Sequence, residues 1–470
     1  MNTHKHRCIV WILTTCCSLL LFISCKKTDG WLDIKRNKSD VLPTSLPDLQ
    51  AIMDNDIYMN TNYPSLGLVS TDNLYIPDDR LGAVSTAGRN AYLWAKDIYG
   101  VGSVPEYTNP YQKIANANIV LERLNLITLT PANQQQWENI KGQALFIRSF
   151  CYYYLAQLFC KAYDSVTASA DLGIPLRTIS DPSVVLGRST VAETYQRMID
   201  DATSAAQLLP AIPQYSTRAS KAAANALLAK LYLNMSAYGK ALQHAEFCLA
   251  AKNDLLDYNG NLIEPGSTYR FPAYKNSGGN PEIIFYAQGY VVSEVNAGAG
   301  AGFADPQLYL MYDDDDRRKT IFFHQHANGL MEPVGRYSGT NRLFAGISTN
   351  EIYFIRMECN ARLGNPTAAL ADLNKLLRLR FVTNTFTDIT EPDADNLLQL
   401  VLNERRKELA FHALLRWEDL RRLNKDTRFA LSLQRNSNGI TYLLPPNDNR
   451  YLFPIPNDEI RLSGIQQNER

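Results

Sequence analysis

The stretch Leu397–Asn424 constrains the fold most, because it combines helical periodicity with charges on the face that should be buried. Its apolar residues recur at three-, four- and seven-residue spacings without Gly or Pro, which predicts one long helix. Arg405 and Glu408 fall on the same stripe, where charges are tolerated only when they are paired and hydrogen-bonded. Glu404 and Glu408 are one turn apart, and Arg405 and Glu408 are three residues apart. We therefore predict a local structural ionic cluster of Glu404, Arg405 and Glu408.

An acid–base site or an anion-binding surface is the alternative interpretation of this cluster. Arginine does not act as a proton-transfer base at neutral pH. The stretch also contains no nucleophile and no pair of metal-binding residues beside the cluster. A buried ionic contact with the element packed on this helix is therefore the interpretation that we favour.

The amino-terminal segment has the pattern of a bacterial export signal. Basic residues precede an apolar run, Cys8–Ile23, which is shorter than the roughly 18 to 20 residues of a membrane-spanning helix. The run ends in Leu21-Phe-Ile-Ser-Cys25, which resembles a lipobox. We predict a lipoprotein signal peptide over residues 1–24, lipidation of Cys25, and a lipidated polar tether over residues 25–30, held to a membrane by several acyl chains. An ordinary cleaved signal, with Cys25 incidental, is the alternative.

The balance of charge argues against nucleic acid as a partner. The 470 residues include 47 Lys and Arg and 47 Asp and Glu. Loss of Lys5 and Arg7 with the signal leaves 45 basic against 47 acidic residues, whereas nucleic-acid binders show a basic excess. The chain is also rich in tyrosine, with 26 residues. This excess fits ring platforms that stack on sugars or peptides, since tyrosine is apolar at one end and hydrogen-bonds at the other.

Helical periodicity dominates the rest of the chain. Pairs of helix patterns joined by short turns occur at about 109–251 and 351–424, with small residues where the two helices meet, as in tetratricopeptide repeats. Thr190 and Glu193 form a capping box that opens one of these helices. The segment 255–350 differs, because it is rich in Gly, Pro, Asn and aromatic residues. Loops of this kind lie on the outside and often carry binding, so we expect a loop-rich insert on the ligand side.

No motif indicates a metal or a cofactor. His324 and His326 alternate near Asp313–Asp316, but no Cys and no third His accompanies them, so we predict no metal site. The run Gly298–Gly302 lacks the dinucleotide fingerprint, and we predict no cofactor. A surface glycosidase stays open as an alternative at this point, because its two carboxylates would pair only in space.

Several motifs, taken in order, resemble the SusD/RagB-like surface lipoproteins of Bacteroidetes along nearly the whole chain. Behind the lipobox they are Trp31-Leu-Asp, Tyr111-Gln-Lys-Ile-Ala-Asn-Ala-Asn118, Gly142-Gln-Ala-Leu-Phe-Ile-Arg148, Gly173-Ile-Pro175-Leu, Arg188-Ser-Thr-Val191, Arg362-Leu-Gly364, Asn403-Glu-Arg-Arg-Lys-Glu408, Asp419-Leu-Arg-Arg-Leu-Asn424 and Phe453-Pro-Ile-Pro456. His412 departs from the pattern, since the family usually has an acid or another polar residue there.

The resemblance implies a mainly α SusD-like fold over residues 31–470, with tetratricopeptide-like helix pairs and an irregular loop-rich portion. It implies a non-catalytic, lipid-anchored protein of the outer membrane that faces outward. Its partner would be a SusC-like TonB-dependent transporter, met by the helical faces. The nutrient would be an oligosaccharide, with a peptide as the alternative from the RagB branch. A pure scaffold that orders the transporter complex without touching substrate is a further alternative.

Ligand-binding candidates follow from the same resemblance. In glycan-binding members of the family, aromatic and amide side chains on the loop-rich face hold the sugar. No single motif marks these positions. On that basis the candidates in this chain are Asn90, Tyr92, Trp94, Tyr274, Tyr290 and Tyr309.

Overall fold

A computed structural model describes residues 43–100, 102–274, 279–295, 300–390 and 393–470. The predicted signal peptide, the tether and Cys25 lie outside the described residues.

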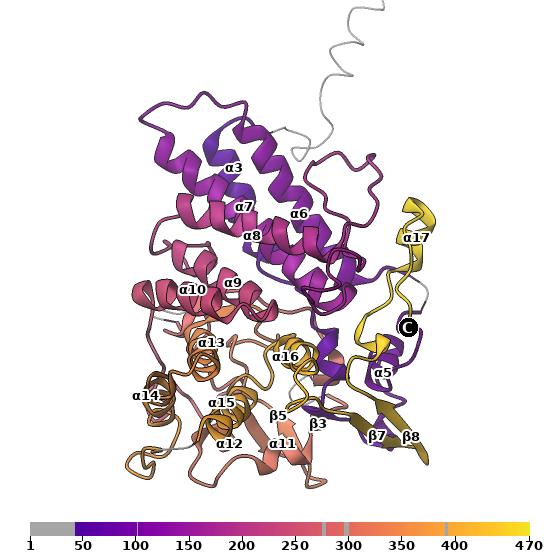
Figure 1. The fold of residues 1–470 in the computed structure, drawn as a ribbon, viewed down its shortest axis with the longest axis vertical. Helices are drawn as coiled ribbons and strands as arrows, with labels where there is room; N and C mark the ends of the chain where they lie inside the picture. The colour runs from indigo at the N-terminus through magenta and orange to yellow at the C-terminus, as the bar shows by residue number, and fades with distance from the viewer. Residues whose placement is uncertain (1–42, 101, 275–278, 296–299, 391–392) are drawn as a thin grey trace, which may run out of the picture.

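Helices form most of the regular secondary structure of the described residues, and the strands are short, so the fold is mainly α (Figure 1). The helices are α3 Leu46–Met53, α4 Asp56–Met59, α5 Thr86–Tyr92, α6 Pro105–Leu124, α7 Gln134–Phe159, α8 Val191–Leu208, α9 Lys221–Asn234, α10 Tyr238–Ala251, α11 Pro306–Leu310, α12 Arg317–Phe322, α13 Thr349–Arg362, α14 Pro366–Leu377, α15 Ala394–Glu408, α16 Leu415–Leu423 and α17 Asn457–Ser463. The strands are β1 Leu74–Tyr75, β2 Ile283–Phe285, β3 Phe303–Ala304, β4 Phe323–Gln325, β5 Met331–Pro333, β6 Ile347–Ser348, β7 Leu433–Ser437 and β8 Ile440–Leu444.

The long helices pack as successive neighbours. Helix α7 contacts α6 and α8, α9 contacts α8 and α10, and α10 contacts α13, which in turn contacts α14 and α15. In Figure 1 this series runs from α3, α6 and α7 at the top to α13, α14 and α15 at the bottom. The strands form four antiparallel pairs, β1–β3, β2–β6, β4–β5 and β7–β8. Between α10 and α13 the described chain has only these short strands and helices of a few residues.

Local signals in the sequence begin and end these helices. The predicted capping box is confirmed: Thr190 Oγ1 accepts a hydrogen bond from Glu193 N at 3.1 Å, and Glu193 Oε2 accepts one from Thr190 N at 2.8 Å. Each contact satisfies a backbone group that has no partner inside the helix. Ser220 caps α9 in the same way, through Ala223 N at 3.1 Å.

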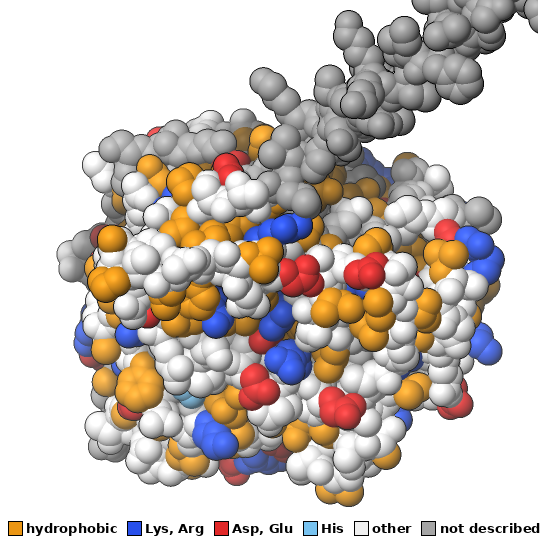
Figure 2. Space-filling model, turned by 90° about the horizontal axis from the view of Figure 1, so that it is seen from above, with side chains coloured by type: hydrophobic (Ala, Val, Ile, Leu, Met, Phe, Trp, Pro, Cys, Tyr) orange, Lys and Arg blue, Asp and Glu red, His pale blue; other side chains and the backbone are white. Residues whose placement is uncertain are grey.

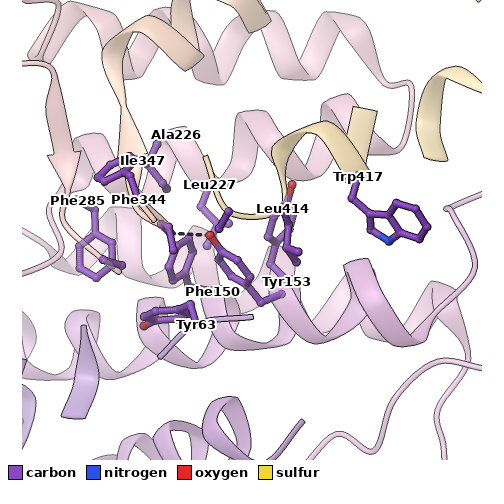
Figure 3. Packing of buried hydrophobic residues seen from close by; sticks show 14 of the residues in the cluster. Tyr63, Phe150, Tyr153, Ala226, Leu227, Phe285, Phe344, Ile347, Leu414 and Trp417 are labelled. Atoms are coloured by element: carbon purple, nitrogen blue, oxygen red, sulfur yellow. Dashed lines mark hydrogen bonds between the residues drawn. The ribbon is translucent and has the colours of Figure 1, made fainter. Parts of the chain in front are cut away.

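The core centres on the second half of α7, where every residue is buried. Phe150 packs against Tyr63 with ring centroids 5.1 Å apart and against Phe285 of β2 at 5.4 Å (Figure 3). Tyr154 Oη donates a hydrogen bond to Ala345 O at 2.6 Å. These contacts join an early loop, a central helix and the loop-rich part of the chain into one core. The loop-rich part of the chain is thereby fixed to its helices.

The prediction of one helix over Leu397–Asn424 is wrong. Helix α15 ends at Glu408 and α16 begins at Leu415, although no Gly or Pro interrupts the stretch. Between them Ala413 N donates to Phe344 O at 2.9 Å, and Ala410 O accepts from Asn73 Nδ2 at 2.8 Å. These backbone groups bind residues distant in sequence instead of their own helix, so tertiary contacts override the local pattern.

Glu404, Arg405 and Glu408 are buried and paired, but not with one another as the predicted local cluster requires. Arg405 pairs with Asp419 at 2.8 Å, toward α16. Glu404 and Glu408 both pair with Arg318, at 2.6 and 3.2 Å. Glu408 also pairs with Arg380 at 2.7 Å. The two groups of ion pairs therefore join α15 to different parts of the fold, one to α16 across the helix break and the other to Arg318 and Arg380.

Among the described residues, no helix is both long enough and apolar enough to span a membrane. Figure 2, which views the molecule from above Figure 1, shows hydrophobic side chains in small groups among charged ones. Scattered apolar groups of this kind are normal for a surface that meets water.

Candidate functional site

The structure places two of the predicted ligand contacts in the interior. Tyr92 is 3% exposed and Trp94 is 2% exposed. The Arg435 guanidinium lies 3.6 Å from the ring centroid of Tyr92 and 4.6 Å from that of Trp94. Trp94 Nε1 donates to Ser70 O at 2.9 Å. Both rings are therefore used for packing and cation–π contact, and a role in stacking on a ligand is not supported for either residue.

Asn90 and Tyr309, two further predicted ligand contacts, are half-buried. Neither of them lines the cavities of Tyr290 and Tyr274 that are described next. Asn90 Nδ2 donates to Ile98 O at 3.3 Å, which ties the end of α5 to the following loop. Tyr309 packs edge-on against Phe323 at 5.4 Å, and Lys319 Nζ lies 5.2 Å from its ring centroid.

Tyr290 lines a cavity of about 520 Å³, called the Tyr290 cavity below. Its walls come from the start of α5, the loop 99–104, the start of α6 and the segment 290–294. The Tyr290 side chain is 37% exposed. This volume lies within the roughly 300–1,000 Å³ that is typical of small-ligand sites.

Backbone pairing positions Tyr290 at the edge of the cavity. Tyr290 N donates to Tyr63 O at 2.7 Å, and Gly289 N donates to Leu343 O at 2.9 Å. A Cβ at Gly289 would lie 2.1 Å from Ser65 Oγ, so only glycine allows this close approach of the two segments. The ring of Tyr290 is therefore carried by a backbone that neighbours hold on both sides.

Tyr99 provides the facing aromatic wall, a role for which the sequence analysis did not choose it. Its ring packs edge-on against Phe453 at 6.4 Å, and its buried hydroxyl has no hydrogen-bond partner among the described residues. Burial raises the pKa of the Tyr99 hydroxyl well above its usual range. The signal that could have found it is the run of small residues after it, Gly100, Gly102 and Ser103, which opens a loop beside an aromatic ring.

Two acids line the Tyr290 cavity, and each is engaged by backbone amides. Glu106 accepts hydrogen bonds from Ser65 N at 2.8 Å and from Leu66 N at 3.3 Å. Burial raises the pKa of Glu106 to about 8, against the lowering effect of these two amides, so its carboxyl is largely protonated at neutral pH. Glu294 accepts from Ser85 N at 3.2 Å and from Ser85 Oγ at 2.9 Å, which ties the segment 290–294 to the N-cap of α5.

Tyr274 lines a separate cavity of about 600 Å³, called the Tyr274 cavity below, which shares no lining residue with the Tyr290 cavity. The ring of Tyr274 stacks on Tyr286 with centroids 3.9 Å apart, and its hydroxyl donates to Asp56. Tyr215 and Asn280 line the same cavity. The six predicted residues thus do not form one site.

Metal-binding residues do not gather in the described part of the chain: it contains no group of three or more His, Cys, Asp or Glu side chains that could hold an ion. Asp316, the last residue of the acidic run, instead pairs with Arg318 at 2.7 Å inside the protein. The thiols of Cys151, Cys160, Cys248 and Cys359 are buried and free.

Two family models match the chain. Residues 30–233 match a SusD-like model described as starch-binding and associating with the outer membrane. Residues 346–470 match the model of the SusD family. Together they cover both the helical half and the carboxyl-terminal part, and the chain belongs to the SusD/RagB-like family.

Individual relatives agree with this assignment. SusD-like protein P2 of Formosa agariphila is 24% identical over 93% of this chain and 96% of its own length. The fold matches a SusD superfamily protein of Bacteroides thetaiotaomicron with a TM-score of 0.71 and 22% identity, over 91% of this chain and 100% of that one. It also matches a SusD-like carbohydrate binding protein of Bacteroides vulgatus with a TM-score of 0.65 and 19% identity, over 90% and 97% of the two chains.

Proposed function

We propose that this protein captures a neutral oligosaccharide in the Tyr290 cavity and delivers it to a SusC-like TonB-dependent transporter. The observation that carries the proposal is the cavity itself, in which Tyr290 and Tyr99 stand at the edge of a space of about 520 Å³. The family, described as starch-binding, supports a carbohydrate as the class of ligand.

The chemistry of the walls fits a sugar. A tyrosine ring offers an apolar face to the C–H groups of a sugar, and its hydroxyl can exchange hydrogen bonds with a sugar hydroxyl. Glu106, when protonated, adds no full charge to the cavity. Glu294 is occupied by Ser85. The cavity is therefore mainly aromatic and polar rather than ionic, which favours a neutral ligand over a charged one.

Calorimetry with the soluble body of the protein tests the proposal. Short oligosaccharides of glucan, mannan, xylan and galactan should include at least one ligand, and Tyr290→Ala should weaken its binding roughly ten-fold. Phe247→Ala is the matched control, because Phe247 is 53% exposed on α10 and lines neither cavity. Unchanged affinity of Tyr290→Ala for every sugar that binds would contradict the site.

Peptide capture is the alternative for the same cavity, and peptides belong in the same calorimetric screen. Binding of peptides in place of all four sugars would identify the protein as a RagB-like peptide binder. A surface glycosidase is favoured by one observation, the raised pKa of Glu106, since a general acid needs that property. Both oxygens of Glu106 are held by backbone amides, so we expect no turnover. Sugar hydrolysis that is lost in Glu106→Gln would overturn the non-catalytic proposal.

Delivery to a transporter and attachment to the outer membrane are parts of the same proposal. A pull-down of the tagged protein from its own outer membrane in mild detergent should recover a TonB-dependent barrel in stoichiometric amount. Recovery of the folded protein alone would contradict the partnership. Cys25→Ser should release the protein from the membrane fraction if acyl chains on Cys25 anchor it. Retention of that variant in the membrane would refute the anchor.

A further inference from the structure

We infer that the Tyr274 cavity is a second binding site for neutral carbohydrate, built on Tyr215 and Asn280. The inference takes its ligand class from the proposed function but rests on different residues. The cavity measures about 600 Å³, and its walls come from the start of α4, the loop between α8 and α9, and the segment 279–283.

Tyr215 is an exposed ring that is held in place. Its side chain is 57% exposed, yet the Arg218 guanidinium lies 5.4 Å from its centroid. Arg218 is itself fixed by two hydrogen bonds to Asp54, at 2.7 and 2.6 Å, and by one to Gln214 at 2.8 Å. Gln214 completes the arrangement by donating to Tyr215 Oη at 3.3 Å. A ring ordered before the ligand arrives loses less entropy on binding than a mobile one.

Asn280 supplies an amide whose donor is unused. The residue is 5% exposed, and its Oδ1 accepts a hydrogen bond from Glu282 N at 3.0 Å. Its Nδ2 has no acceptor among the described residues. A buried donor without a partner is costly, so it is normally satisfied by water or by a ligand. Because Asn280 lines the cavity, a sugar hydroxyl bound there is the acceptor that we assign to this donor, and Asn280→Asp tests that contact.

The charged groups around the cavity already have partners within the protein. Arg218 pairs with Asp54, and Lys252 pairs with Asp254. Asp56 accepts a hydrogen bond from Tyr274. An anionic or cationic ligand would have to compete with these contacts, whereas a neutral sugar needs only a ring face and hydrogen bonds. The geometry therefore favours a neutral carbohydrate over a charged peptide.

The two cavities lie at opposite ends of one stretch of backbone. Ile283 lines the Tyr274 cavity and Tyr290 lines the Tyr290 cavity. The six residues between them would span roughly 20 Å if extended, at about 3.3 Å per residue. Short sugars should therefore occupy the two cavities independently.

Calorimetry with the sugar panel named above tests this site. In a Tyr290→Ala background, adding Tyr215→Ala should weaken the residual sugar binding roughly ten-fold. Adding Asn280→Asp to the same background should have a similar effect. This second change keeps the size of the side chain and its acceptor but removes the donor. Phe247→Ala should leave it unchanged. Tyr215 is exposed, so its loss should not impair folding even if a change at Asn280 does.

The outcomes separate the two sites. Binding that is lost entirely in Tyr290→Ala and is unaffected by Tyr215→Ala overturns the second site and leaves the first. Binding that responds to Tyr215→Ala but not to Tyr290→Ala supports the second site and overturns the first. Binding of peptides but of no sugar, or of no member of the panel, overturns the carbohydrate assignment of both.

Discussion

Replacing Glu408 with glutamine should destabilise the protein by about 3–5 kcal/mol, the usual cost of removing one partner from a buried ion pair. Glu408 is 1% exposed and accepts hydrogen bonds from Arg380 Nε at 2.8 Å, Arg318 Nη1 at 3.2 Å and Asn350 Nδ2 at 2.9 Å. Glutamine keeps one acceptor oxygen but turns an NH2 group toward two guanidinium groups. At least one charge-assisted hydrogen bond is then lost and a positive charge is left without its partner.

The buried network has one more acid than it has bases. When Glu408 is replaced, Glu282 should therefore partly compensate for the missing negative charge and limit the loss of stability. Its acids are Asp316, Glu282, Glu404 and Glu408, and its bases are Arg318, Arg380 and Lys407. Burial raises the pKa of Glu282, and the charge of Glu408 raises it further, against the lowering effect of Arg380. Neutralising Glu408 therefore lowers the pKa of Glu282 and favours its ionised form beside Arg380.

A double-mutant cycle measured by urea unfolding tests this reasoning. Glu282→Gln alone should cost less than Glu408→Gln, because Glu282 contacts one guanidinium, that of Arg380, whereas Glu408 contacts those of Arg318 and Arg380. The double variant should cost about 1–2 kcal/mol more than the two single changes together, since Glu282 can then no longer compensate. Glu264→Gln, at an exposed acid, should change stability by less than about 0.5 kcal/mol. An additive cycle, or a Glu282→Gln as costly as Glu408→Gln, would refute the argument.

Three other predictions concern stability. Thr190→Ala should cost about 1 kcal/mol by removing the cap of α8, measured as a lower urea midpoint; no change would mean that the cap contributes nothing. Phe150→Ala should cost about 3–5 kcal/mol by opening a hole among the core rings, unless the surroundings collapse into it. Burial lowers the pKa of His412 to about 3. Below about pH 6.5 the unfolded chain therefore takes up a proton at His412, whereas the folded chain does not. Stability is consequently lost as pH falls from 6.5 toward 3. Relative to His412→Phe, the wild type should therefore lose about 2–3 kcal/mol between pH 6.5 and 4.5, and parallel pH profiles would contradict this.

The helices were largely predictable because their signals are local. The capping box at Thr190 and Glu193 acts within one turn, and the structure shows it as predicted. The break between α15 and α16 was not predictable in this way, since the backbone groups that leave the helix bind Phe344 and Asn73.

The candidate site was harder to predict, because exposure of a ring depends on segments far away in sequence. Tyr92, Trp94 and Tyr99 look alike as aromatic residues of one short segment. The structure buries the first two beneath Arg435, which comes from β7, and leaves Tyr99 at a cavity wall. Nothing within 90–99 marks that difference, since Arg435 lies more than three hundred residues further along the chain.

Motif order, periodicity and capping depend on neighbouring residues, so they were enough to predict the family, the order of the main helices and the burial of the charges at 404–408. Three features depend instead on contacts between distant segments: the different partners of Arg405 and Glu408, the end of the long helix at Glu408, and the separate cavities lined by Tyr290 and Tyr274. Those outcomes depend on which distant segments meet, and a buried charge or ring takes its partner from whatever the fold places beside it.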